Sequence, residues 1–140
     1  MTEIAHRFLP IHLLNLARSI MRVPRADLVG TWPRASAILG RQALEITLDQ
    51  LWAQAAPGVE NASARAQLTC LPEYIDPELA SRIRYSWHVL SSACHHHAYE
   101  LPPIESELNG WLDEVEALIA EVRGRDRTRA RRSRGPRPSG

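Results

Sequence analysis

Hydrophobic residues recur along the chain at intervals of three and four, the spacing that gathers them on one face of an α-helix. Proline and glycine residues interrupt this pattern and divide it into five predicted helices. These predicted helices span residues 11–22, 31–55, 61–71, 76–99 and 104–123. No segment shows the apolar–polar alternation that is typical of a strand. We therefore expect an all-α fold, an antiparallel bundle of four to five helices.

The segment 104–123 has the clearest helical pattern in the chain. Its apolar positions are Ile104, Leu108, Trp111, Leu112, Val115, Leu118, Ile119 and Val122. Acidic residues lie mostly elsewhere around the helix, so one face should pack on the bundle while the other meets water. Gly110 stands in the middle of this segment, where glycine costs about 1 kcal/mol relative to alanine. We interpret it as a point of close approach to another helix.

The segment 31–55 is apolar around most of its circumference, which predicts a central position in the fold. The polar residues of this segment form one narrow stripe, which comprises Arg41, Gln42, Glu45 and Asp49. Arg41 and Glu45 are oppositely charged and four residues apart, so their side chains should meet on the helix surface. We interpret them as a structural ion pair at the edge of the core. The alternative is a polar stripe that lines a cleft.

Charge divides the chain into two unlike parts. Residues 123–140 contain eight arginines and one aspartate, a net charge of +7, whereas residues 1–122 contain nine arginines and fifteen acids, a net charge of −6. From Gly124 onward no apolar residue is larger than alanine or proline, so burial cannot offset the cost of ordering. We predict a helical bundle over 1–122 and a disordered arginine-rich tail over 123–140. Such a tail would attract polyanions, RNA above all, or would simply aid solubility.

Several classes of protein are disfavoured by what the sequence lacks. No run of 18 uncharged apolar residues is present and the N-terminal segment has no signal-peptide core, so we expect a cytoplasmic protein without a membrane segment. Cys70 and Cys94 do not form a short-spaced metal pair, and we expect both to be free, buried thiols. Without a phosphate loop or a dinucleotide fingerprint, no cofactor is predicted.

The most unusual local feature is the run Cys94-His95-His96-His97 that precedes Ala98 and Tyr99. Adjacent helical residues point about 100° apart, so three consecutive histidines cannot converge on one metal ion without unwinding. We therefore predict no metal site there, although a histidine-cluster metalloprotein is a third possibility beside the two functions given below.

The helix predicted over 76–99 has two apolar faces. One is a stripe that should be buried, formed by Ile83, Trp87, Leu90, Cys94, His97 and Leu101. The opposite face comprises Tyr85, Val89, Ser92, His96 and Tyr99. It is too apolar and aromatic for free solvent, which indicates a second contact surface. A homodimer interface is one candidate.

Two motifs carry a resemblance to a known family. His97-Ala98-Tyr99 stands just before the last predicted helix, and the segment Arg41 to Glu45 reads Arg-Gln-Ala-Leu-Glu. Over roughly residues 31–122 the chain resembles the HEPN group of RNA-cleaving and RNA-associated helical domains. Ribonuclease members of that group carry an arginine, four to six residues, then a histidine that many continue as His-x-Tyr. The resemblance implies a dimeric bundle that cuts RNA without metal, with His97 as acid or base and Tyr99 in support.

The sequence departs from this family at the motif arginine, because Ser92 occupies that position. The charge that stabilises a phosphate transition state would then come from Arg41, Arg82, Arg84 or a partner, with His95 and His96 as further acid–base candidates. Arg82 also precedes His88 at the motif's spacing, but without the tyrosine.

Two functional hypotheses follow from the resemblance. One is a metal-independent endoribonuclease of toxin–antitoxin or defence type. In two-gene systems of this family a nucleotidyltransferase antitoxin adds AMP to the motif tyrosine, so Tyr99 would be its target. The other is a non-catalytic HEPN-like module that binds a protein partner or RNA.

Overall fold

A computed structural model describes residues 9–22, 32–95 and 101–135, and every regular element in these ranges is helical. The elements are α2 (Pro10–Arg22), α3 (Trp32–Ala55), the 3-10 helix η2 (Val59–Asn61), α4 (Ala64–Cys70), the 3-10 helix η3 (Leu71–Glu73), α5 (Pro77–Cys94) and α6 (Glu105–Ser133). The predicted all-α class is therefore confirmed for this part of the chain. None of these helices is long and apolar enough to cross a lipid bilayer.

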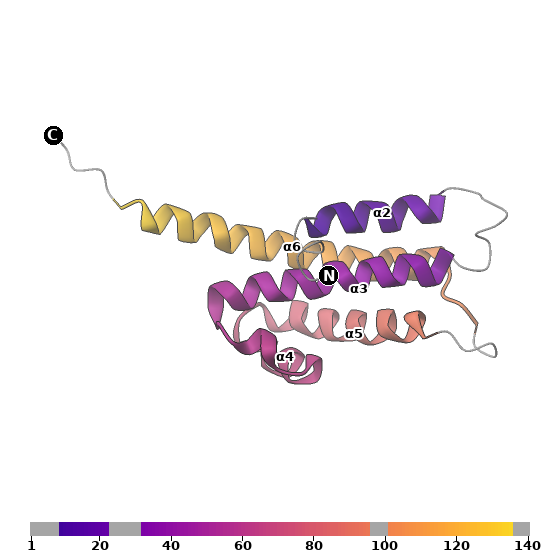
Figure 1. Cartoon of the computed structure of the whole chain (residues 1–140), viewed down its shortest axis with the longest axis horizontal. Coiled ribbons are helices and arrows are strands. Elements are labelled where there is room, and N and C mark those ends of the chain that lie inside the picture. Colours follow the sequence, from indigo (N-terminus) through magenta and orange to yellow (C-terminus); the bar gives the residue numbers. More distant parts are fainter. Residues whose placement is uncertain (1–8, 23–31, 96–100, 136–140) are drawn as a thin grey trace.

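Four long helices lie side by side, and the colours in Figure 1 show that each runs opposite to the one before it in the sequence. α3 packs against α2, α5 and α6, as its nearly continuous apolar surface predicts. The short helix α4 lies at the end of the molecule where α3 stops and α5 starts (Figure 1). The helix α5 therefore contacts α4 on one side and α6 on the other.

Trp52 anchors the connection between α3 and α5. Its side chain is fully buried, and its ring meets that of Tyr74 edge-on with a centroid separation of 5.3 Å. The buried indole Nε1 donates a hydrogen bond of 2.9 Å to Oε1 of Gln67 on α4. A buried tryptophan needs such a partner for its polar atom, so Trp52 fixes the position of α4 and η3 against α3.

The helix α5 starts within one residue of the predicted start but ends earlier than predicted. Asp76 accepts a hydrogen bond of 3.1 Å from the amide of Leu79, which satisfies one free donor of the first turn. The helix ends at Cys94 because His95 has φ −109° and ψ 47°, outside the helical region, rather than continuing to residue 99 as predicted.

The early end of α5 also shortens the predicted buried stripe. Ile83, Leu90 and Cys94 are buried as expected and Trp87 is partly buried, whereas the burial predicted for Leu101 is wrong, since its side chain is 95% exposed. Leu101 lies beyond the helix, where a period of 3.6 residues no longer decides which face a side chain occupies. His97, the other member of the stripe, lies outside the described residues.

The helix α6 is longer than the sequence pattern predicts. It continues to Ser133, so the predicted boundary at residue 123 and the disorder predicted beyond it are wrong for residues 123–133. Arginine and alanine favour helix, and Arg125 and Arg129 donate hydrogen bonds to the carbonyls of Tyr74 and Gln54. The prediction weighed only apolar burial and missed these polar contacts. Residues 136–140 of the predicted tail lie outside the described part.

The apolar face predicted for α6 is confirmed along most of its length. Six of its residues are buried, namely Leu108, Leu112, Val115, Leu118, Ile119 and Val122. Trp111 is partly buried, while Ile104, which precedes the first turn, is 60% exposed and was wrongly placed on the packed face. The face therefore begins one turn later than the sequence indicates.

The close helix approach predicted at Gly110 occurs at a different glycine. A Cβ atom built on Gly110 would meet no atom within 4 Å, so the interpretation of this residue as a packing glycine is wrong. A Cβ atom on Gly40 of α3 would lie 2.5 Å from Cδ2 of Leu112, which is closer than real contacts allow. The tight contact between α3 and α6 therefore depends on Gly40.

Candidate functional site

Arg41 takes part in a fixed cluster between α3 and α5. Its Nε donates a hydrogen bond of 3.2 Å to Oε1 of Glu45, which confirms the predicted ion pair. The guanidinium also lies over the ring of Trp87, 5.0 Å from the ring centroid. Such cation–π contact holds the plane of the guanidinium against the indole. The guanidinium of Arg41 therefore contacts Glu45 on α3 and Trp87 on α5, and so links the two helices.

Cys94 lies beside this cluster and is buried. Burial raises the pKa of its thiol, and the nearby charge and hydrogen bond of Arg41 lower it by less. A thiol needs to ionise to act as a nucleophile. Cys94 is therefore a protonated packing residue at neutral pH rather than a reactive group.

Arg82 takes part in the contact between α5 and α6. Its Nε donates a hydrogen bond of 2.9 Å to Oε2 of Glu114. His88, which follows it at the family's arginine–histidine spacing, lines a different depression of the surface. Six residues correspond to about 240° around a helix. The structure therefore does not bring Arg82 and His88 together.

Arg84 and His88 do share one face of α5, because they are four residues apart. They line a groove between α4 and α5 with a volume of about 730 Å³. The lining of this α4–α5 groove consists of Arg65, Leu68, Ser81, Arg84, Tyr85, Trp87 and His88. It contains no acidic residue. Arg84 was predicted as a charge donor, whereas Arg65 was missed.

The α4–α5 groove combines groups that suit a phosphate-bearing aromatic ligand. Tyr85 has a side chain that is 61% exposed, so its ring is accessible from solvent. Arg65 and Arg84 are exposed cations without a hydrogen-bond or ion-pair partner among the described residues. Guanidinium groups bind phosphate oxygens in a fork-like geometry, and aromatic rings stack on unpaired bases. The volume is within the range of small-ligand sites.

The remaining predicted site residues are only partly placed. His96, His97 and Tyr99 lie outside the described residues, so the structure does not place them relative to any arginine. Ser92, at the position of the family's motif arginine, is exposed on α5 and lines a shallow depression with Leu101 and Trp111. Within ranges 9–22, 32–95 and 101–135, no group of three or more histidine, cysteine or acidic side chains could hold a metal ion.

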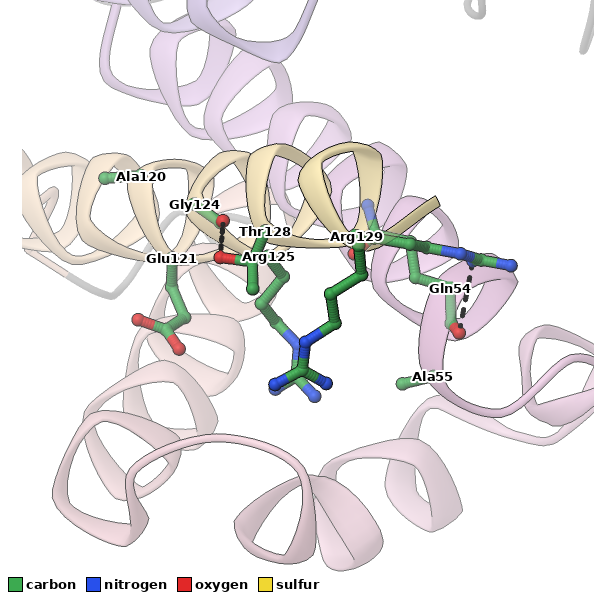
Figure 2. Close-up of a pocket in the computed structure, with 9 residues that line it drawn as sticks. Gln54, Ala55, Ala120, Glu121, Gly124, Arg125, Thr128 and Arg129 are labelled. Atoms are coloured by element: carbon green, nitrogen blue, oxygen red, sulfur yellow. Dashed lines mark hydrogen bonds between the residues drawn. The ribbon is translucent and has the colours of Figure 1, made fainter. Parts of the chain in front are cut away.

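A second basic pocket, of about 480 Å³, lies between the end of α3 and the C-terminal half of α6 (Figure 2). Its lining is Gln54, Ala55, Ala120, Glu121, Gly124, Arg125, Thr128, Arg129 and Arg132. Nη1 of Arg129 donates to the carbonyl of Gln54 at 3.5 Å, in the last turn of α3, where carbonyls lack helical partners. Arg129 therefore has a structural role in this pocket, because it places a positive charge at the C-terminal end of α3.

Comparison of the chain with protein-family models, with curated proteins and with solved structures finds no match.

Proposed function

We propose that the protein is a HEPN-like RNA-binding module whose α4–α5 groove takes single-stranded RNA. The observation that carries this proposal is the convergence of two arginines, His88 and an accessible tyrosine in one groove without an acid in its lining. Single strands are favoured because unpaired bases can leave the stack and lie on an aromatic ring. The HEPN resemblance supports RNA as the ligand but rests on the sequence alone.

Each type of residue in the groove would contact a different part of the RNA. Arg84 and Arg65 would neutralise phosphates from α5 and α4 respectively, so the strand would cross both helices. Tyr85 would carry a base, since stacking on an aromatic ring contributes about 1–3 kcal/mol per base. Trp87 forms the inner wall and is fixed by Arg41 on α3. The groove would therefore be preformed rather than assembled on binding.

Binding of a fluorescent single-stranded RNA tests this proposal. Tyr85→Ala and Arg84→Gln should each weaken the affinity by about tenfold, as expected for the loss of about 1.4 kcal/mol. Arg82→Gln is the matched control, since it removes the same charge from the same helix but outside the groove. It should bind RNA as the wild type does. Unchanged affinity of both groove variants would rule out the groove as the binding site.

Metal-independent RNA cleavage is a second candidate, because His88 and Arg84 line the same groove. An imidazole can accept or donate a proton, and a guanidinium can stabilise the charge of the phosphate transition state. The HEPN resemblance assigns the acid–base role to His97 instead. The toxin or defence role, the homodimer and the nucleotidyltransferase partner belong to this same hypothesis.

Incubation of the purified protein with total RNA in EDTA distinguishes these assignments. Cutting that disappears in His97→Ala but not in His88→Ala would support the HEPN motif, and the reverse would support the groove. If neither histidine variant changes the RNA pattern, the endonuclease hypothesis fails while the binding proposal stands. A double variant of both histidines controls for overlap between the two residues.

A further inference from the structure

The C-terminal half of α6 forms an arm that extends beyond the other helices (Figure 1). Its residues from Asp126 to Gly135 are all exposed, whereas the preceding Val122 is still buried in the core. The arm is a regular helix through Ser133. Its arginines therefore have fixed directions around the helix axis, unlike those of a disordered tail.

These arginines fall into two rows on different sides of the arm. The inner row is Arg125, Arg129 and Arg132, which line the pocket against α3 shown in Figure 2. The outer row is Arg123, Arg127 and Arg131, and Arg134 at the end of the helix falls on the same side. Successive members of the outer row are four residues apart, and at 100° per residue all three fall within about 80° of the helix circumference.

The outer row has no contact that explains it. Within the described part of the chain, its three exposed side chains form no hydrogen bond or ion pair, whereas Arg125 and Arg129 of the inner row donate to carbonyls. Like charges four residues apart on a helix repel each other and destabilise it slightly. The helix dipole favours cations only in the last turn, which excludes Arg123 and Arg127. The outer row therefore slightly destabilises the helix, and no contact within the described residues offsets this.

We propose that the outer row binds the phosphate backbone of RNA and forms a second contact, separate from the α4–α5 groove. This inference rests on the proposed function, because that function identifies the polyanion as RNA. Cβ atoms four residues apart on a helix lie about 5–6 Å from each other, so adjacent guanidiniums can pair with separate phosphates of one strand. The row spans about 12 Å. The arm leaves the molecule at the end where α4 lies (Figure 1).

The salt dependence of RNA binding tests this second contact. Each phosphate neutralised on a single strand contributes about −0.7 to the slope of log K against log salt concentration. Replacement of the three outer arginines by glutamine should therefore reduce the magnitude of that slope by about 2. Glutamine keeps a high helix propensity, so the thermal midpoint should be unchanged or slightly higher. A variant with three outer lysines should keep the wild-type slope.

The inner row supplies a control with the same change in net charge. Replacement of Arg125, Arg129 and Arg132 by glutamine should lower the thermal midpoint while the slope changes less than in the outer-row variant. Equal loss of slope in both variants would show a general charge effect and overturn the proposal. An unchanged slope in the outer-row variant would also overturn the proposal. The same holds if the outer-row variant loses binding to phosphatidylserine vesicles but keeps its binding to RNA.

The groove and the arm can fail separately in the same titrations. If Tyr85→Ala binds RNA normally while the outer-row variant loses slope, the groove proposal fails and the arm remains. If Tyr85→Ala loses affinity at every salt concentration and the outer-row variant keeps its slope, only the arm proposal fails.

Discussion

Arg18 is the side chain that ties the first described helix to the last. Its guanidinium donates to Oδ1 of Asn109 at 3.0 Å, to Oδ1 of Asp113 at 2.8 Å and to Oε2 of Glu116 at 3.1 Å. The Arg18 side chain is 17% exposed, so solvent screens these contacts less than it screens a surface ion pair. Hydrogen bonds to charged groups contribute more than neutral ones.

We expect Arg18→Ala to lower the free energy of unfolding by about 1.5–3 kcal/mol, the range for hydrogen bonds to charged groups. Urea denaturation followed by circular dichroism measures this change. Arg22→Ala is the control, since Arg22 is an exposed arginine of the same helix with no partner among the described residues. Its effect should stay within about 0.5 kcal/mol. Equal effects of the two variants would contradict the role given to Arg18.

The predicted site shows which residue pairs a sequence can reveal. Arg41 and Glu45 were recognised because helical periodicity alone brings residues four apart together. The partner of Arg82 was not, because Glu114 belongs to another helix and the pair depends on how α5 and α6 pack. Arg65 was missed for the same reason. The spacing of Arg84 and His88 was present in the sequence and could have indicated the groove.

The starts of α5 and α6 were predicted more closely than their ends. The start of α5 carries a specific chemical signal, the side chain of Asp76 followed by Pro77. Its end carries none, because His95 leaves the helical conformation without a glycine or proline. The end of α6 was placed ten residues early because hydrophobicity falls at Arg123 while helix propensity does not. Periodicity identifies buried faces, but the last turns depend on local contacts.

Two glycines on packed helices should respond oppositely to alanine. Gly40→Ala should lower the free energy of unfolding by about 1–3 kcal/mol, because its Cβ atom would press on Leu112 and force the core to shift. Gly110→Ala should raise it by about 0.5–1 kcal/mol, since its Cβ atom would meet nothing and alanine is the better helix former. Thermal unfolding of both variants measures the difference in sign. A stabilising Gly40→Ala would show that α3 and α6 can separate at little cost.

At the scale of the whole molecule, one face exposes large apolar side chains to solvent. The exposed side chains of Leu101 and Ile104 precede α6, beside a depression lined by Val89 and Trp111. Contiguous apolar surface of this kind marks contact with another macromolecule. The face includes Val89 and Ser92, two of the residues that the sequence pattern proposed as a dimer interface, whereas Tyr85 belongs to the α4–α5 groove.

We expect this face to join two copies of the chain, as the HEPN resemblance implies. Analytical ultracentrifugation at micromolar concentrations should show a dimer, and Leu101→Asp combined with Ile104→Asp should give a monomer, since a buried unpaired charge opposes association. Leu16→Asp is the matched control, because Leu16 is an exposed leucine of α2, away from this face. A monomeric wild type would refute the interface.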